Sequence, residues 1–497
     1  MAIWRSIAAF AAIFGAVVDG SALFPRYGHK GLVESGKLRK LIKADALRKR
    51  AEKLEDIAYR SPGKNRVIGS QGHEDTVDYI VNEIKKFPDY YTVSLQGVEL
   101  AIGGGANVTA NNNTIEAYSV TLGPSGHASG PLVSIPNLGC EESDFPDSLE
   151  GSIALIFRGI CESGIKVGYA ASKGAVGVII YNNVDGSLEG YSLQKFEDPE
   201  NPYVPTAGIS QGAGESLVAQ LDGGAEIIVD LITEAEVKTS YNINAQTKGG
   251  DQENVIHIGG HSDSVAAGPG INDNGSGSMS ILEIATQLTR FSVKNAVRFS
   301  WWTAEEAGLL GATYYVMQLS QEEKDKIRLF LDFDMMASPN YAFQIYDGDG
   351  SAFNLTGPPG SAEAEAEFTR YFADIAKVNH TEIEFDGRSD YGPFLEAGIA
   401  AGGIACGAEG IKTEEEQAMF GGAAGVPYDV NYHEDGDTTN NLNYEAWIQM
   451  TRAISHMTAT YARSFNSLPP RNATAARKRA ATGYARFKNT ARFQKWV

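Results

Sequence analysis

The feature that most constrains the fold of this chain is a strand–loop–helix pattern that repeats from residue 244 to about residue 458. Short apolar runs alternate with segments whose apolar residues recur at helical spacing. Uniformly apolar strands separated by helices indicate a sheet that helices bury on both faces. In such sheets the functional side chains gather in loops at the carboxyl ends of the strands. The pattern predicts an α/β domain with strands at 255–258, 297–302 and 329–333 and helices at 278–288 and 307–317.

A different sequence pattern interrupts this domain at residues 119–240. Apolar runs at 151–156 and 176–181 lie between turns rich in Gly and Pro, which predicts a compact β-rich insert. Before the insert, residues 46–57 and 74–86 have helical spacing. The expected organisation is one domain made of residues 46–118 and 241–465, with the insert between its two parts.

The two ends of the chain carry signals of their own. Residues 1–22 have the composition of a secretory signal peptide, with Arg5 before an apolar run at 7–18. This run is too short for a permanent membrane helix, and no later stretch is long enough, so we expect an extracellular protein rather than a vacuolar or membrane-anchored one. Residues 23–45 are expected to form a zymogen-like pro-region or an extended arm. The basic residues 466–497 are expected to be a disordered or processed tail.

Composition and cysteine usage narrow the class of protein. The formal net charge of -20 argues against nucleic-acid binding, which needs a basic surface. Cys140 and Cys161 could form a disulfide in an oxidising compartment, and Cys406 is expected to be a buried, inert thiol. Glycosylation sequons agree with export and begin at Asn107, Asn112, Asn354, Asn379 and Asn472. The triple glycine at 103–105 lacks the context of a phosphate-binding loop and is expected to form a turn.

Five polar motifs follow predicted strands or lie in loops of the α/β domain. Their central residues are His261, Asp273, the pair Glu305 and Glu306, Asp334, and His433. Taken singly, each has an ordinary structural interpretation, such as a turn aspartate or an acidic first turn of a helix. The gaps between them are too long for a zinc finger, whose ligands come in short pairs. Together they predict a catalytic metal site assembled from several strand ends.

The ligand chemistry favours two metal ions. Two histidines and three carboxylates can give each ion one of each, and the two oxygens of Asp273 can each bind one ion. Of the adjacent pair, Glu306 suits a ligand and Glu305 a general base, because two buried carboxylates repel each other unless cations lie nearby. Asp263 is close enough in sequence to orient the ring of His261. The sequon at Asn274 falls inside this site, so we do not expect it to carry a glycan.

These motifs, with residues 387–391 and Tyr432, resemble the co-catalytic zinc aminopeptidase family, especially its secreted fungal leucine aminopeptidases. The resemblance covers roughly residues 40–460. It implies a zinc-dependent exopeptidase fold, with a central mixed β-sheet flanked by helices, and it identifies the insert as a protease-associated (PA) domain. In such proteins the PA domain covers the catalytic mouth, although a passive scaffold is the alternative.

The resemblance also implies the roles of individual residues. One Zn²⁺ would bind His261 and Asp334, a second would bind Glu306 and His433, and Asp273 would bridge them. Arg388 and Tyr432 would bind substrate and the oxyanion. Met335 would offer an apolar wall to the first side chain of the substrate.

The sequence departs from the family pattern at two places. Many relatives flank the last histidine with two cysteines, whose places are taken here by Asn431 and Gly436, so other contacts must hold that loop. Some relatives place a bulky aromatic residue in the stretch 402–407, where this chain has Ala405. A preference for leucine is therefore less strongly implied than the reaction itself.

The reaction implied is hydrolysis of the first peptide bond of a substrate with a free N-terminus, by a monomer. Glu305 would take a proton from a metal-activated water and pass it to the leaving amine, while Tyr432 stabilises the oxyanion. Three alternatives stay open. They are a metallopeptidase acting on C-terminal residues or dipeptides, an inactive binding protein of the same fold, and a single-zinc cyclising transferase.

Overall fold

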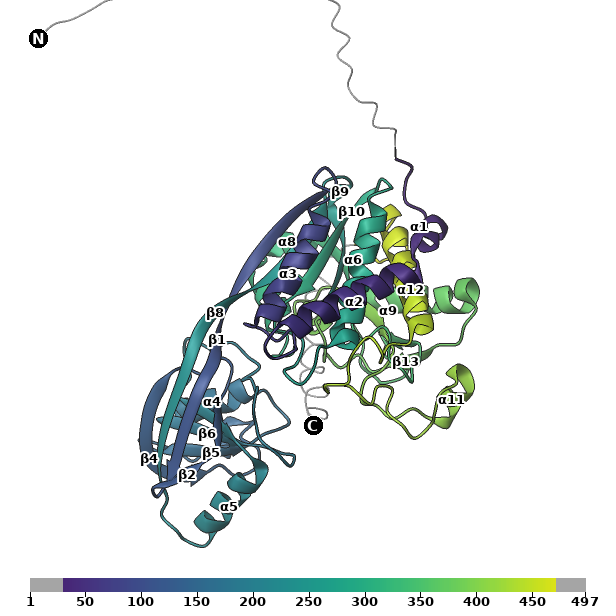
Figure 1. Cartoon of the computed structure of the whole chain (residues 1–497). Coiled ribbons are helices and arrows are strands. Elements are labelled where there is room, and N and C mark those ends of the chain that lie inside the picture. The colour runs from purple at the N-terminus through teal and green to yellow at the C-terminus, as the bar shows by residue number, and fades with distance from the viewer. Residues whose placement is uncertain (1–29, 471–497) are drawn as a thin grey trace, which may run out of the picture.

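The computed structural model describes residues 30–470, which form two lobes (Figure 1). A long antiparallel ribbon of β1 (Tyr91–Ala110) and β8 (Ile228–Thr247) runs from one lobe into the other. The predicted signal segment 1–22, the sequon at Asn472 and the tail beyond residue 470 lie outside the described residues. Among the residues described, no helix combines the length and the apolar character needed to cross a membrane.

The larger lobe is built on a mixed sheet, as predicted. Its strands follow the order β13-β12-β14-β11-β9-β10-β8. The four central strands β14, β11, β9 and β10 are parallel, whereas β12 and β8 run antiparallel to their neighbours β14 and β10. The bounds are β9 (Asp251–His261), β10 (Asn295–Trp302), β11 (Ile327–Phe333), β12 (Gln344–Tyr346), β13 (Thr381–Ile383) and β14 (Ala401–Ala405).

Helices cover both faces of this sheet, which explains why its strands are almost uniformly apolar. On one face Phe299 and Trp301 belong to a core shared with α6 and α12, and on the other Trp302 and Phe330 pack with α7 and α10. The helices of this lobe are α1 (Ser35–Leu41), α2 (Ala44–Arg60), α3 (Gln71–Ile84), α6 (Gly277–Leu288), α7 (Leu310–Gln318), α8 (Gln321–Lys326), α9 (Ser361–Arg370), α10 (Tyr391–Glu396), α11 (Glu414–Phe420) and α12 (Tyr444–Arg463).

The predicted helices at 46–57 and 74–86 correspond to α2 and α3, and the preceding arm is not simply extended. Residues 35–41 form α1, and Val33, Leu38 and Ile42 are fully buried in the main core. The helix α1 packs against α12, so burial rather than helix propensity orders this short segment. The described part of the arm is therefore an integral part of the larger lobe.

The smaller lobe is the predicted β-rich insert. Its sheet has the order β4-β5-β6-β7-β3, and β4 pairs with the far end of β8. The elements are β2 (Asn113–Ile115), β3 (Ala117–Ser119), β4 (Gly126–Ser134), β5 (Ile153–Phe157), α4 (Ser163–Ser172), β6 (Gly177–Tyr181), β7 (Thr206–Ile209) and α5 (Gln211–Asp222). The end of β1 already pairs with β2, so the chain enters the insert within this ribbon.

The expectation of a turn at the triple glycine is wrong. Residues 103–105 lie inside β1, where the pairing register with β8 shifts between Gly103 and Gly105. Such a shift is a β-bulge, and a glycine inside a strand often marks a bulge. The bulge lets one continuous strand connect the two lobes.

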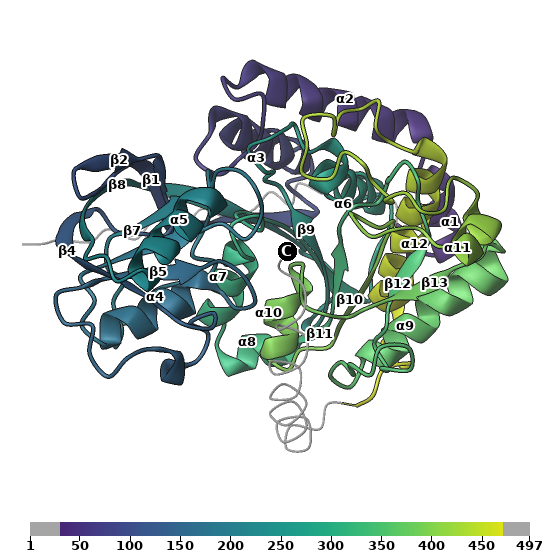
Figure 2. The same ribbon diagram turned by 90° about the horizontal axis from the view of Figure 1, so that it is seen from below.

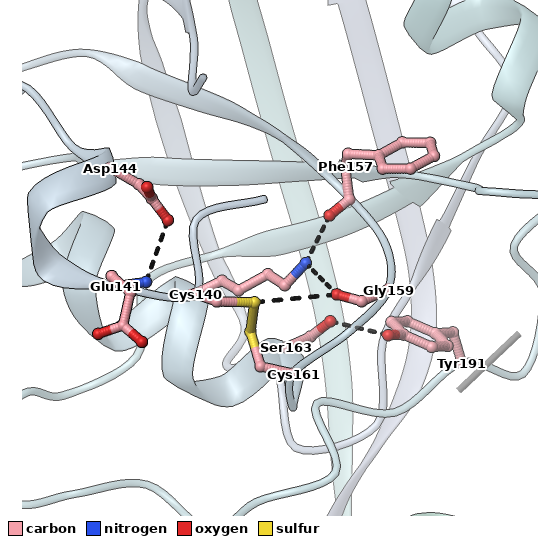
Figure 3. The surroundings of a disulfide bond; sticks show 9 residues. Cys140, Glu141, Asp144, Phe157, Gly159, Cys161, Ser163 and Tyr191 are labelled. Atoms are coloured by element: carbon pink, nitrogen blue, oxygen red, sulfur yellow. Dashed lines mark hydrogen bonds between the residues drawn. A yellow bond between two sulfur atoms is a disulfide. The ribbon is translucent and has the colours of Figure 1, made fainter. Parts of the chain in front are cut away.

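The predicted disulfide between Cys140 and Cys161 is present (Figure 3). Next to it, Lys166 Nζ donates to the carbonyl oxygens of Phe157 at 2.6 Å and Gly159 at 2.8 Å. These bonds and the disulfide fasten the loop that follows β5 to the rest of the insert. Cys406, by contrast, is buried in the larger lobe, and burial raises the pKa of its thiol, as expected of an inert side chain.

Candidate metal centre

The structure brings all the predicted ligands to one edge of the central sheet. His261 is the last residue of β9, Glu305 and Glu306 follow β10, and Asp334 follows β11. These three strands are parallel neighbours, so their carboxyl ends meet. Asp273 lies in a π-helical turn (Ile271–Ser276) before α6, and His433 lies in the loop between α11 and α12.

Asp273 lies between the two histidines. Its Oδ1 is 3.2 Å from His261 Nε2, and its Oδ2 is 3.2 Å from His433 Nε2. Each histidine has a second carboxylate, since Asp334 Oδ2 is 3.4 Å from His261 Nε2 and Glu306 Oε2 is 3.1 Å from His433 Nε2. Two groups of three potential ligands share Asp273, and Glu305 forms a further group with His261 and Glu306.

Several of these atoms are buried without a hydrogen-bond partner. They include both ring nitrogens of His261, Glu306 Oε1 and Asp334 Oδ1. Buried polar atoms nearly always have a hydrogen-bond partner. A cluster of unpaired nitrogen and oxygen atoms that face one another therefore indicates the site of a bound ion. Imidazole nitrogens and carboxylate oxygens are the donors that Zn²⁺ takes at catalytic sites. The residues present fit the metal centre that the sequence predicts.

The electrostatics of the cluster favour bound cations. Burial raises the pKa of Glu305 well above its usual range, and the neighbouring carboxylates of Glu306 and Asp390 raise it further. Burial alone would lower the pKa of His261, but the carboxylates of Asp334 and Glu305 outweigh it and raise this pKa strongly. Repulsion between so many buried carboxylates is relieved when cations lie among them.

Asp263 joins the first ligand to the catalytic turn. Its Oδ1 lies 3.6 Å from His261 Nδ1 and accepts the backbone N–H of Glu305 at 3.2 Å. Its Oδ2 accepts the N–H of Glu306 at 3.3 Å. The side chain thus contacts the histidine ring, as the sequence suggests, and also holds the turn that carries both glutamates.

Arg66 is a residue that sequence reasoning missed. It is fully buried, and its guanidinium donates to the carbonyl oxygens of Ser262, Pro269 and Gly270. Burial lowers its pKa to about 10, an effect opposed by the carboxylates of Asp263 and Asp437, so the side chain stays cationic at neutral pH. Arg66 connects the loop after His261 to the loop before Asp273. A lone arginine in a loop has no motif that could have revealed this contact.

Asp437 follows His433 in the same loop. Its carboxylate accepts the backbone N–H groups of Asn272 at 2.7 Å and Asp273 at 2.9 Å. Burial raises the pKa of Asp437 to about 8. Beside them, the fully buried Asn274 donates its amide to the carbonyl oxygen of Phe333 at 2.9 Å, so its sequon is inaccessible, as predicted.

The loop of His433 is held without a disulfide. Asn431 Nδ2 donates to Asn441 Oδ1 at 2.7 Å, and Gly436 is packed so tightly that a Cβ there would lie 2.1 Å from Asn431 Oδ1. The ring of Tyr432 stacks on that of His433, with centroids 3.8 Å apart. The two positions where relatives carry cysteines are therefore in contact here through an asparagine.

The structure places the remaining predicted residues as follows. Met335 follows Asp334 and is buried, and Ala405 is buried at the end of β14. Arg388 forms an ion pair of 2.7 Å with Glu409. Ser389, which the sequence analysis did not single out, donates its hydroxyl to Asp334 Oδ2 at 2.9 Å.

A parallel sheet edge at which two histidines and several carboxylates converge on a shared aspartate defines a metal-dependent hydrolase of the α/β class. The chain belongs to peptidase family M28, whose model matches residues 242–458, and a PA domain is matched at residues 128–217 within the insert. Together with the relatives below, this makes the protein a metallo-aminopeptidase.

Two similar proteins span nearly the whole chain. A protein named "Probable leucine aminopeptidase 2" from Aspergillus fumigatus is 48% identical over 459 residues, covering 92% of this chain and 91% of its own. Leucine aminopeptidase 2 of Arthroderma otae is 46% identical and covers 94% of each chain. Among solved structures, the aminopeptidase from Aneurinibacillus sp. strain AM-1 has a TM-score of 0.65 at 26% identity, covering 88% of this chain and 99% of that one.

Proposed function

We propose that this protein is a secreted aminopeptidase with two zinc ions, which removes N-terminal residues from peptides and prefers apolar residues such as leucine. The observation that carries the proposal is Asp273, which faces a different histidine with each of its two oxygens. His261 and Asp334 would hold one ion, and Glu306 and His433 the other. A single ion would not need both histidines, which disfavours the one-zinc alternative.

Two zinc ions held there would supply a water of lowered pKa and would polarise the scissile carbonyl. Glu305 Oε2 lies 3.9 Å from His261 Nε2. Glu305 groups with His261 and Glu306 but not with the bridging Asp273, so we assign it the acid–base role. Glu305 accepts the proton of the attacking water and gives it to the leaving amine. We assign to the Tyr432 hydroxyl and the Arg388 guanidinium the stabilisation of the charge that develops on the carbonyl oxygen.

The substrate's N-terminus gives the enzyme its exopeptidase character. The buried carboxylates of Glu305 and Asp334 offer a free ammonium group a charge partner, which a blocked N-terminus would lack. The side chain of the first substrate residue would lie against Met335. The small Ala405 would leave more room for this side chain than an aromatic residue at that position. Leucine is therefore proposed as one of several apolar residues accepted.

The proposal is tested by measuring zinc content together with hydrolysis of leucine amide and N-acetyl-leucine amide. We expect about two zinc ions per chain and rapid hydrolysis of the free amide only. One zinc per chain, or equal rates on the two substrates, would contradict it. Hydrolysis from the C-terminus of a peptide blocked at its N-terminus would favour the carboxypeptidase alternative.

A further inference from the structure

A cavity of about 720 Å³ lies between the insert and the larger lobe. Its walls come from the insert, including α4, the loop that precedes it and the loop between β6 and β7, and from α7, α10 and the loops that precede them. Figure 2 shows the two lobes side by side, with α7 and α10 on the side that faces the insert. Apart from Arg388, no residue to which a functional role is assigned above lines this space.

One end of the cavity adjoins the catalytic turn. Gly308 and Leu309 line it, and the backbone N–H of each donates to the carbonyl oxygen of Glu305 at 2.8 Å. The insert also comes close to this turn. A Cβ added to Gly308, whose φ is +109°, would lie 2.6 Å from the Cα of Gln194. Arg388, which neighbours Tyr432, lines the cavity as well. One end of the cavity is therefore formed by the turn whose backbone carries Glu305, although the Glu305 side chain does not line it.

The direction of the substrate follows from the role of Glu305. This carboxylate protonates the leaving amine, so the nitrogen of the second substrate residue must lie beside it. The peptide downstream of the scissile bond then leaves along the turn of Glu305, and that turn is a wall of the cavity.

The charges lining the cavity favour a particular class of peptide. Two cations, Lys195 and Arg388, are outnumbered by the carboxylates of Glu141, Glu162, Glu197, Asp198, Asp386 and Glu396. The charge of Arg388 is already balanced by Glu409, which does not line the cavity. Rings of Tyr169 and Phe196 add apolar surface. A concave wall with an excess of one charge concentrates ligands of the opposite charge.

We propose that this cavity binds the residues downstream of the scissile bond, and that it favours peptides with basic side chains there. The insert would then supply one wall of a substrate-binding site and would not only cover the catalytic mouth. This inference rests on the proposed aminopeptidase function. Leucine amide has no downstream residues, so its hydrolysis tests the reaction separately from the cavity.

The first test compares leucine amide with the tetrapeptides Leu-Gly-Lys-Gly and Leu-Gly-Glu-Gly in the zinc-loaded enzyme. We expect the lysine peptide to have a kcat/KM about threefold to tenfold above the glutamate peptide at low ionic strength, and the difference to shrink with added salt. The double variant Glu197→Gln, Asp198→Asn should reduce this ratio toward one. Both side chains are exposed, and the amides keep the acceptor oxygens that bond the N–H groups of Tyr203 and Glu200.

A matched control removes two charges from the insert outside the cavity. Asp222→Asn with Glu226→Gln makes the same charge change at exposed positions that do not line it, and should leave the ratio unchanged. If both double variants changed the ratio equally, the overall charge of the protein rather than the cavity would explain the preference, and the proposal would be overturned. An unchanged ratio in the cavity variant would overturn it as well.

The second test fills the cavity. Gly168 lines it from α4, and a Cβ there would meet only Asn201, at 3.8 Å. Replacing a helical glycine favours the helix, so Gly168→Phe should fold. We expect it to leave the kcat/KM of leucine amide unchanged and to lower that of the lysine tetrapeptide about tenfold. Equal losses on both substrates would place the cavity at the first residue and contradict the proposal, and no loss on either would show that peptides do not enter it.

Discussion

Glu305 and Glu306 are adjacent in sequence, yet the structure gives their carboxylates different surroundings. Glu306 Oε2 is 3.1 Å from His433 Nε2, and this pair shares Asp273. Glu305 lies farther from its nearest histidine, at 3.9 Å. The backbone N–H groups of both donate to the one carboxylate of Asp263, so a single side chain positions the backbone of the turn that carries them.

This difference predicts what Glu305→Gln should do. The amide keeps the size of the side chain but cannot carry a proton between water and amine, so kcat should fall by about three orders of magnitude. Zinc content, measured on the same sample, should stay at the wild-type value. The matched variant Glu306→Gln should instead lower zinc content, and near-normal turnover in Glu305→Gln would contradict the assignment of the acid–base group.

Arg66 leads to a second prediction at this scale. Arg66→Met would leave three buried carbonyl oxygens without their donor and remove a cation from among four nearby carboxylates. We expect a loss of about 3 kcal/mol in the free energy of unfolding and weaker retention of zinc against a chelator. Arg66→Lys keeps the charge but not the fork of donors, so it should recover part of the zinc affinity and little of the stability. Wild-type values of both in Arg66→Met would refute this role.

At the scale of elements, the ribbon of β1 and β8 determines how the insert is attached. A flexible linker would let the insert move freely, whereas two paired strands continuous with both sheets transmit its position to the larger lobe. The insert also touches the catalytic turn through Gln194 and packs Phe196 near Tyr314. The loops of the insert that face the cavity therefore need to be well ordered.

The disulfide between Cys140 and Cys161 orders two of those loops, since both cysteines line the cavity. It closes a loop with a sequence separation of 21, for which the chain-entropy model gives about 3 kcal/mol. The variant Cys140→Ser, Cys161→Ser should thus unfold at lower temperature. Its melting curve should no longer respond to a reductant that lowers the wild-type midpoint. The buried Cys406→Ser serves as a control, because that variant should keep the response to reductant.

For the whole molecule, the parts that could be predicted are those encoded by local pattern. Apolar strands followed at once by polar residues placed His261 and Asp334 at one sheet edge, because the ends of parallel strands must meet there. The contacts of Arg66 reach residues about two hundred positions away and leave no local signature. The triple glycine was misjudged because a bulge and a turn both need glycine, and only the partner strand distinguishes them.

The final prediction concerns the surface of the whole molecule and the proposal of secretion. The sequons at Asn107, Asn112, Asn354 and Asn379 all have exposed asparagines, whereas Asn274 is fully buried and bonded through its amide. A glycan is attached to an accessible asparagine in the secretory pathway. The protein recovered from the medium of a eukaryotic host should therefore lose mass on treatment with a peptide N-glycosidase, and peptide mapping should find Asn274 unmodified. A glycan on Asn274 would contradict the buried position of that segment. Accumulation of unglycosylated protein inside the cells would contradict the secretion of the chain.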